Sequence, residues 1–204
     1  YWGPNLLRNL FSNPNCHVSH VIDLSLERQR YVKEMYPSII VSDDIRDVIS
    51  NDKIDAVVIS TPVSTHFNLA KECLHSKKHI LVEKPMAQTA SQVSKISEIS
   101  SKKNLVAMVG HTFLFNPAVR YIKKLINNKE LGDLRYIYSQ RLNLGRIRSD
   151  VDALWNLAPH DISIIQYWLD DLEPISVNRS GSSFVQNNID DVVFLSLKYP
   201  NNIL

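Results

Sequence analysis

The sequence predicts an α/β protein: a doubly wound parallel sheet without its first strand, followed by an incomplete α+β domain with a mostly antiparallel sheet. Up to about residue 116, short apolar runs alternate with amphipathic stretches of helix length, as in successive βα units. The apolar run 79–82 ends in Glu83-Lys84-Pro85, which is typical of a buried strand with polar groups at its carboxyl end. From residue 117 the order changes to helices and alternating strands.

Composition indicates a globular protein with two domains, residues 1–116 and 117–204. The 204 residues are 44% hydrophobic and carry a net charge of +2 without a long basic stretch, which argues against a nucleic-acid partner. Two cysteines, Cys16 and Cys73, are too few for a disulfide framework, and both lie in patterns of secondary structure rather than metal loops. No apolar stretch approaches the roughly 20 residues of a membrane span. We expect a cytoplasmic protein without a metal site.

The first part of the chain predicts a helix first, because the apolar pairs of residues 6–11 share one face and Pro4 suits a first helical turn. The capping box Thr89-Ala90-Ser91-Gln92 predicts the start of a later helix. The other expected elements up to residue 116 are strands at 18–23, 39–41, 56–59, 79–82 and 105–109, and helices at 26–35, 45–49, 69–74 and 89–102.

The second part predicts a helix at 117–126, a turn at 131–133 and a long alternating strand at 134–142. A helical pattern then covers 153–169, but Pro159 costs a hydrogen bond there, so we expect the helix proper to begin near Pro159. Strands are expected at 175–180 and 192–199.

A parallel sheet that begins with a helix predicts a dinucleotide fold of Rossmann type. In that fold the first strand is followed by a glycine-rich turn, and Tyr1-Trp2-Gly3 fits the end of such a turn, with Gly3 permitting close packing of helix on strand. Asp23 lies 20 residues beyond Gly3, where a carboxylate accepts the adenosine ribose hydroxyls. Its charge favours NAD over NADP, although Arg28 follows on the next helix. The alternative is that Asp23 is a helix N-cap.

Polar residues follow further strands of this predicted sheet. Ser60-Thr61-Pro62 follows strand 56–59, and His66 comes shortly after it. Lys84 follows the next strand, and the segment from His111 to Asn116 follows the one after that. Carboxyl ends of parallel strands are where open α/β sheets bind ligands, so these groups are expected to converge. The alternatives are a solvated lysine, hydroxyls that cap a helix, and a surface histidine.

A second group of candidates lies beyond residue 150. Asn156 and His160 are four residues apart, which puts them on one face of the predicted helix. A lone histidine is more often a hydrogen-bonded structural residue than a catalyst, and the paired polar face among apolar residues weakens that preference here.

Together these residues resemble the Gfo/Idh/MocA family of oxidoreductases. The resemblance covers the whole chain and rests on the motifs Tyr1-Trp2-Gly3-Pro4-Asn5, Ser60-Thr61-Pro62 with His66, Glu83-Lys84-Pro85, and Leu154-Trp155-Asn156-Leu157-Ala158-Pro159-His160-Asp161. It implies a nicotinamide-binding Rossmann domain, an α+β domain whose sheet covers the active site, and oxidation or reduction of a sugar or cyclitol carbon.

The resemblance also implies roles for single residues. Lys84 and His160 are implied as catalytic groups: Lys84 would stabilise negative charge on the reacting hydroxyl, and His160 would act as general base, since an imidazole with its ordinary pKa of about 6.5 suits that task. The implied cofactor-binding residues are Trp2, Gly3, Asp23, Ser60, Thr61, Pro62, His66, Glu83 and Lys84. The implied substrate-binding residues are Lys84, His111, Asn116, Arg141, Asn143, Arg146, Asn156 and His160.

One position departs from the family pattern. Members often carry Asp four residues before the histidine, whereas this chain has Asn156, which binds a hydroxyl but takes up no proton. This departure keeps open a cofactor-binding regulator without turnover, while Lys84 and His160 argue for an enzyme.

Within the family, the start and the histidine motif resemble nucleotide-sugar dehydrogenases of the UDP-N-acetylglucosamine 3-dehydrogenase type. Arg141, Asn143, Arg146 and Arg148 offer donors for a diphosphate or a sugar carboxylate, or else form a solvated basic edge. A free sugar or cyclitol dehydrogenase is the alternative. Because members of the family are longer, we expect a chain truncated at both ends that is inactive by itself, and a homodimer or homotetramer at full length.

Overall fold

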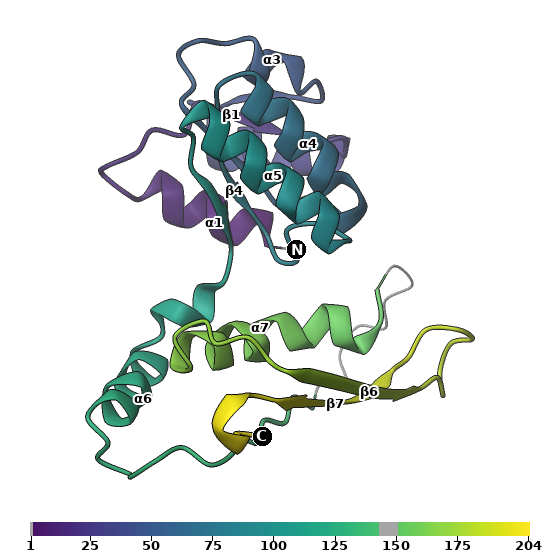
Figure 1. The fold of residues 1–204 in the computed structure, drawn as a ribbon. Helices are drawn as coiled ribbons and strands as arrows, with labels where there is room; N and C mark the ends of the chain where they lie inside the picture. Colours follow the sequence, from purple (N-terminus) through teal and green to yellow (C-terminus); the bar gives the residue numbers. More distant parts are fainter. Residues whose placement is uncertain (1, 143–150) are drawn as a thin grey trace. The chain divides into compact units, whose positions relative to one another are not determined.

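The computed structural model describes residues 2–142 and 151–204 (Figure 1). The chain divides into two compact units, Tyr1–Gly110 (unit 1) and His111–Leu204 (unit 2). The short helix η1 (Thr112–Phe115) packs against α6 (Pro117–Asn127) and α7 (Ala153–Trp168). Residues 111–116, which the sequence analysis assigns to the first domain, therefore belong by their contacts to unit 2.

Unit 1 contains five parallel strands in two hydrogen-bonded sheets. Strand β1 (His20–Ile22) pairs with β2 (Ile40–Ser42), and β4 (His79–Val82) lies between β3 (Ala56–Ile59) and β5 (Ala107–Val109). All strands in each sheet run in the same direction, so their carboxyl ends meet at one edge of that sheet. The parallel α/β architecture expected from the alternating pattern is thus present, in two parts.

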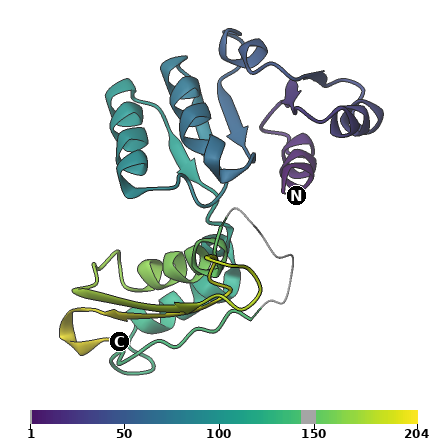
Figure 2. The same ribbon diagram turned by 90° about the vertical axis from the view of Figure 1, so that its right-hand side faces the viewer.

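In the described part of unit 1, helix α1 precedes the strands and four further helices connect them. Their bounds are α1 (Gly3–Phe11), α2 (Leu26–Met35), α3 (Arg46–Ile49), α4 (Val63–His75) and α5 (Ala90–Lys103). Thr89 caps α5 by accepting a hydrogen bond from the Gln92 amide at 3.3 Å, as the capping box predicts, while the Gln92 side chain accepts from the Gln88 amide. Helices α4 and α5 lie side by side against the three-stranded sheet (Figures 1 and 2).

The core of unit 1 lies between α4, α5 and the three-stranded sheet. Its most buried side chains, each at most 2% exposed, include Ala70, Cys73, Leu74, Ile80, Val82 and Ile96. The stripe of residues 70, 73 and 74 follows helical spacing, while residues 80 and 82 follow strand spacing. Burial raises the pKa of the Cys73 thiol to about 11, so this cysteine remains protonated at neutral pH.

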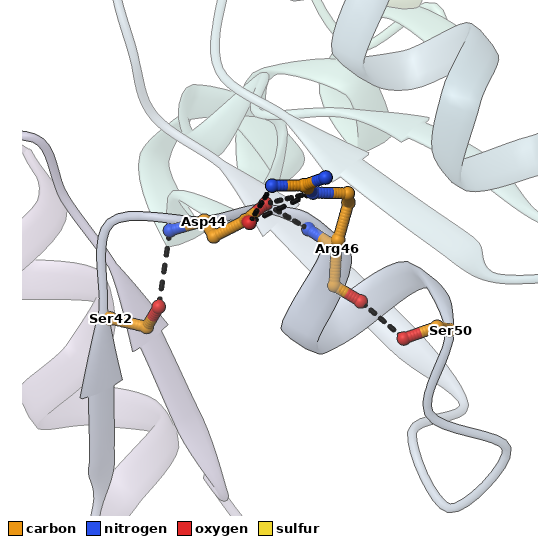
Figure 3. A network of polar contacts seen from close by, with 4 residues as sticks. All are labelled: Ser42, Asp44, Arg46 and Ser50. Atoms are coloured by element: carbon orange, nitrogen blue, oxygen red, sulfur yellow. Dashed lines mark hydrogen bonds and ion pairs between the residues drawn. The ribbon is translucent and has the colours of Figure 1, made fainter.

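The turn from β2 into α3 is held by local polar contacts (Figure 3). The Ser42 hydroxyl accepts a hydrogen bond from the Asp44 amide at 3.1 Å, and the Asp44 carboxylate accepts from both the amide and the guanidinium of Arg46. Asp44 therefore satisfies a free amide at the helix start, the role of an N-terminal acidic side chain.

Unit 2 combines helices α6 and α7 with an antiparallel pair, β6 (Ser176–Ser182) and β7 (Val192–Lys198), followed by the short helix η2 (Pro200–Asn202). Helix α7 packs on β7, whose residues 193, 195 and 197 are half-buried while its alternate residues are exposed. On α6, the buried Lys123 ammonium donates to the Trp168 carbonyl oxygen at 3.0 Å and pairs with Asp170 at 2.7 Å. It thereby caps the carboxyl end of α7.

Two expectations for unit 2 are wrong. Residues 134–142 form no strand, because an extended segment needs a ladder of backbone partners, and here Ile137 donates to the Leu204 carbonyl while the Leu204 amide donates to Arg135. Helix α7 begins at Ala153 rather than near Pro159. Asp152 caps it by accepting from the Trp155 amide at 2.8 Å, and the helix continues through the proline despite the lost hydrogen bond.

Across the described ranges, no helix is both long enough and apolar enough to cross a bilayer. In the same ranges, no three His, Cys, Asp or Glu side chains gather as a metal-binding group.

Candidate active site

The ends of the three-stranded sheet bring the first set of predicted residues together. The backbone places Ser60, Glu83 and Gly110 directly after β3, β4 and β5. The Glu83 amide donates to the Ile59 carbonyl and the Gly110 amide to the Val82 carbonyl, both at 2.8 Å, so the parallel ladder continues past the strands. Ser60 and Glu83, both predicted from sequence, therefore lie at the ends of neighbouring strands, at the carboxyl edge of this sheet.

The absence of a side chain at Gly110 allows close packing at the carboxyl edge of this sheet. A Cβ atom at Gly110 would lie 3.1 Å from Glu83 Oε1, tighter than ordinary contact, so the glycine makes room for the Glu83 carboxyl group. Burial raises the pKa of Glu83, and the hydrogen bond from the Lys84 amide with the charges of Lys84 and His66 opposes that rise. The sequence analysis assigns no role to Gly110, although a glycine at a strand end is itself a signal of close approach.

Lys84 follows Glu83 directly and is half-buried, at the carboxyl end of the central strand of its sheet. This is the position at which the sequence places it, and the peptide bond to Pro85 is cis. The residues after it, Met86 and Ala87, are buried in the core, so the lysine is held between a hydrogen-bonded strand and packed apolar side chains.

Helix α1 approaches the end of β3 at its first residue. A Cβ atom at Gly3 would lie 3.3 Å from the Ser60 hydroxyl oxygen, so the glycine permits this approach. Trp2 precedes it and is 46% exposed. A helix N-terminus with its free amide groups favours anions, and the glycine lets this helix start lie close to the end of β3.

Asp23 lies one residue beyond β1, and its carboxylate is held by its neighbours. It accepts from the Ser25 amide at 2.9 Å and pairs with Arg28 at 3.4 Å. The N-cap of α2 is Ser25, so the alternative that Asp23 caps this helix is wrong. The Asp23 side chain is 28% exposed, which leaves part of the carboxylate open at the strand end.

The loop after β3 contains a mixture of exposed and buried predicted residues. Thr61 and Pro62 are exposed, and the Thr61 hydroxyl shares a hydrogen bond with that of Thr65 at 2.7 Å. His66 is only 2% exposed, and its ring nitrogens contact the Thr61 and Pro85 carbonyl oxygens. The surface alternative for His66 is therefore wrong, and the ring has no nitrogen left for a cofactor while both contacts are made.

In unit 2, α7 carries Asn156 and His160 one turn apart, as the spacing predicts. The Phe113 ring of η1 meets the His160 ring edge to face, with 4.9 Å between centroids. Residues Thr112, Phe113, Phe115 and Asn116 line a cavity of about 260 Å³.

The flanks of η1 carry two predicted substrate residues, His111 and Asn116. Asn116 caps α6, since its side-chain oxygen accepts from the Ala118 amide at 2.8 Å. His111 immediately precedes η1. A cap explains the residue type at position 116 without a ligand, which sequence reasoning missed although Asn before Pro117 is a typical helix start.

The Arg141 side chain is held by contacts within unit 2. Its guanidinium donates two hydrogen bonds to the Asp161 carboxylate, at 2.7 and 3.0 Å, and lies 5.0 Å from the Phe113 ring centroid. Ser139 donates to the same carboxylate at 2.9 Å. In this arrangement Arg141 is not presented as a free donor for a diphosphate.

Asp161 closes the histidine motif of the sequence analysis, which assigns it no role of its own. Burial raises its pKa, but the hydrogen bonds from Arg141 and Ser139 outweigh burial and hold the pKa below its usual range. The carboxylate lies next to His160 in the chain, yet its partner is 20 residues upstream, and no local pattern indicates such a pair. The predicted residues Asn143 and Arg146, with Arg148, lie outside the described residues.

These positions fit a dinucleotide. A helix start at Gly3, a partly exposed carboxylate at Asp23 and hydroxyl groups at Ser60 and Thr61 are the kinds of group that suit a pyrophosphate and a ribose. Unit 1 is accordingly a nucleotide-binding domain of Rossmann type.

Comparison with known proteins gives the family. Residues 1–111 match the sequence model of the oxidoreductase family Gfo/Idh/MocA, described as having an NAD-binding Rossmann fold. The match covers more than half of the chain, and the chain belongs to this family.

Three curated relatives illustrate the range of the family. A 4-carboxy-2-hydroxymuconate-6-semialdehyde dehydrogenase from Sphingobium sp. is 29% identical over 81% of this chain and 55% of its own length. A UDP-N-acetylglucosamine 3-dehydrogenase from Acidithiobacillus ferrooxidans is 30% identical over 68% of this chain and 43% of its own. An NADP⁺-dependent scyllo-inositol 2-dehydrogenase from Bacillus subtilis is 26% identical, with coverages of 75% and 43%. The chain thus spans about half the length of these relatives.

Solved structures agree on the fold. An NAD-binding protein from Listeria innocua superposes with a TM-score of 0.89 at 20% identity, over 99% of this chain and 61% of that one. The α/β fold expected from the sequence, with parallel strands followed by an antiparallel pair, is confirmed.

Proposed function

We propose that the full-length protein is an NAD-dependent oxidoreductase that transfers a hydride between nicotinamide and a hydroxyl-bearing carbon of a sugar or cyclitol. The observation that carries this proposal is that unit 1 places Asp23 and Lys84 beyond the carboxyl ends of the parallel strands β1 and β4 and opens its first helix at Gly3. Membership of the Gfo/Idh/MocA family supports it.

NAD, when bound, supplies the hydride acceptor, and the residues of this chain supply the rest of the chemistry. The start of α1, which Gly3 allows to pack close to the end of β3, would lie against the pyrophosphate, and the Asp23 carboxylate would accept hydrogen bonds from the adenosine ribose. The Lys84 ammonium binds the substrate hydroxyl and stabilises negative charge on its oxygen. An imidazole nitrogen of His160 takes the hydroxyl proton, and the Asn156 amide binds a neighbouring hydroxyl.

This mechanism requires Lys84 of unit 1 and His160 of unit 2 to act on one alcohol. Removal of the proton as the carbon–hydrogen bond breaks leaves a carbonyl group, so both residues act on the same oxygen. Their meeting stays a prediction. Its test is a crosslink between cysteines placed at Pro62 and Trp155, exposed positions in the loop after β3 and in the first turn of α7, which forms in the presence of NAD if the units close on one site.

The finer proposal is that the substrate is a UDP-sugar. The 30% identity with a UDP-N-acetylglucosamine 3-dehydrogenase supports it. The engagement of Arg141 by Asp161 favours the second candidate, a free cyclitol or sugar, because it removes one expected donor for the diphosphate. Homo-oligomer formation at full length is part of the same proposal.

The test is a substrate screen with the full-length protein, following nicotinamide absorbance with NAD⁺ or NADP⁺. The substrates are UDP-N-acetylglucosamine, UDP-glucose, scyllo-inositol and glucose. Turnover of a UDP-sugar supports the finer proposal, and turnover of inositol or glucose alone overturns it while keeping the oxidoreductase. Binding of NAD without turnover of any hydroxyl substrate would leave the cofactor-binding regulator as the better description.

Cofactor preference tests the role of Asp23. Replacing Asp23 with Ser removes the charge that repels a 2′-phosphate and leaves Arg28 beside the site, so the ratio of kcat/KM for NADP to that for NAD should rise by about 100-fold. Arg28→Ala is the matched variant and should lower that ratio. An unchanged ratio in both variants would contradict this role of Asp23.

A further inference from the structure

The imidazole of His66 connects the ends of two neighbouring strands. The residue lies in the first turns of α4 and its side chain is 2% exposed. Nε2 lies 2.8 Å from the Thr61 carbonyl oxygen in the loop after β3, and Nδ1 lies 2.9 Å from the Pro85 carbonyl oxygen after β4. The ring therefore joins the two loops from within the protein.

Both partners of the ring are acceptors. A carbonyl oxygen donates no hydrogen, so both contacts are hydrogen bonds when each ring nitrogen carries a proton. A ring with one proton would bring a nitrogen lone pair against a carbonyl oxygen at hydrogen-bond distance.

The contact of His66 with the Pro85 carbonyl oxygen holds the backbone directly after Lys84. Before Lys84, the chain is fixed by the hydrogen bond from the Glu83 amide to β3, and after it by the burial of Met86. Between these points stands Pro85, which has no amide hydrogen, so its carbonyl oxygen is the polar backbone group through which it can be held. The Lys84 amide has a longer contact, 3.3 Å, with the Glu83 side chain.

We propose that His66 is a positioning residue for Lys84: by holding the Pro85 carbonyl oxygen against the loop after β3, it sets where the lysine ammonium lies at the strand end. This inference rests on the proposed function for the role of Lys84. The prediction from sequence that His66 binds the cofactor directly is replaced by this indirect role.

Two amide variants separate the two contacts of the ring in the full-length protein. The side-chain amide of His66→Asn lies where Nδ1 was and keeps a donor for Pro85, whereas that of His66→Gln lies where Nε2 was and keeps a donor for Thr61. If the ring acts through Pro85, kcat falls by about 100-fold in His66→Gln and His66→Ala, with KM for NAD within about threefold. His66→Asn should recover at least tenfold of that loss.

His75→Ala is the matched control, because it removes an exposed histidine from the other end of the same helix. A merely structural histidine would lower the amount of folded protein in all three His66 variants alike and leave kcat per folded molecule unchanged. Equal kcat in His66→Asn and His66→Gln would therefore overturn the proposal, and the amide pair keeps the test open even if His66→Ala fails to fold.

Two further measurements need no turnover. Amide hydrogen exchange at Lys84 and Met86 should rise about tenfold in His66→Gln but stay near the native rate in His66→Asn. Nitrogen chemical shifts of the native His66 ring should show a proton on Nδ1, which a hydrogen bond to the Pro85 carbonyl oxygen requires, and an Nδ1 without a proton would contradict the proposal. If the native protein binds NAD but oxidises no sugar, the proposed function fails, while these two measurements still decide whether His66 fixes the lysine loop.

Discussion

The candidate residues of unit 1 are placed by strand topology, whereas those of unit 2 are placed by side-chain contacts. In unit 1, Asp23, Ser60 and Glu83 each follow a strand, so parallel pairing puts them at sheet edges. In unit 2, His160 is positioned by a helix, by the edge of Phe113 and by the contacts of the adjacent Asp161 with Arg141. A site built on strand ends is therefore encoded locally, and one built on distant side chains is not.

The largest expected effect separates the two catalytic candidates, one in each unit. Lys84→Met removes a positive charge from the strand end, so kcat should fall by about 1,000-fold at every pH tested. His160→Asn removes a proton acceptor, so its loss of kcat should be greatest where the native ring is neutral and should shrink at low pH. The measurement is the pH profile of kcat in the full-length protein.

Lys53→Met is the control for this comparison, because Lys53 is exposed in a loop of unit 1. A pH profile that is lowered evenly by His160→Asn would contradict a proton-accepting role. Loss of activity in Lys53→Met of similar size would show that the effect of Lys84→Met is not local.

Core packing gives the next largest effect. Leu74 is 0% exposed between α4, α5 and the sheet, so Leu74→Ala should lower the free energy of unfolding of unit 1 by about 3 kcal/mol. Phe194, on the open face of β7, is 73% exposed, and Phe194→Ala should change the stability of unit 2 by less than about 0.5 kcal/mol. Hydrogen exchange resolved by residue measures the stability of each unit separately. Equal losses of stability in Leu74→Ala and Phe194→Ala would contradict this prediction.

Most of unit 1 could be predicted from the sequence, because its candidate residues follow directly after elements that the local pattern identifies. Runs such as 79–82 are apolar because both faces of a central parallel strand are covered, and the stripe at residues 70, 73 and 74 marks the face of α4 that covers it. The positions of Gly3, Asp23 and Lys84 then follow from where the elements begin and end.

The failures lie where distant partners decide the outcome. The alternation in 134–142 predicts a strand, but pairing depends on a neighbouring chain, and the described contacts there are with Leu204. The buried bridge of His66 and the pair of Arg141 with Asp161 join residues about 20 positions apart, which no short motif encodes. A local signal accounts for one further failure: Pro159 predicts a helix boundary, yet the Asp152 cap about two turns upstream starts the helix earlier.

Loss of the ion pair between Arg141 and Asp161 in unit 2 should have an intermediate effect on stability. Asp161→Asn keeps the shape of the side chain but loses the charge, and since the carboxylate is 21% exposed we expect unit 2 to lose about 1 kcal/mol at neutral pH. The pKa of Asp161 is lower in the folded protein than the usual carboxyl value of about 3.9, so the native advantage is complete above that value and disappears as pH falls through the folded pKa.

Chemical denaturation of both proteins from neutral to acidic pH measures this advantage. Asp171→Asn, at an exposed position just beyond α7, is the matched control and should give no pH-dependent difference. An advantage of the native carboxylate that grew as pH fell would have the wrong sign and would refute the assignment.

The smallest effect is expected for an exposed ion pair of unit 1. Hydrogen bonds from Lys102 and Lys95 lower the pKa of Glu98 to about 2, but the three side chains are open to solvent. Surface pairs of this kind contribute little and are screened by salt, so Glu98→Gln should leave Tm within error of Glu34→Gln. A clear decrease in Tm that salt abolishes would show that helix α5 depends on this pair.

The capped end of α7 has a consequence for chemical labelling. Lys123 is 7% exposed and its ammonium is shared between the Trp168 carbonyl and Asp170, so acylating reagents will reach it far more slowly than the exposed amine of Lys124 on the same helix. Its rate of acylation, followed by mass spectrometry, is therefore an internal reporter of whether α6 and α7 separate. Any sugar, nucleotide or solvent that loosens the helix bearing His160 will be registered first as a newly reactive lysine.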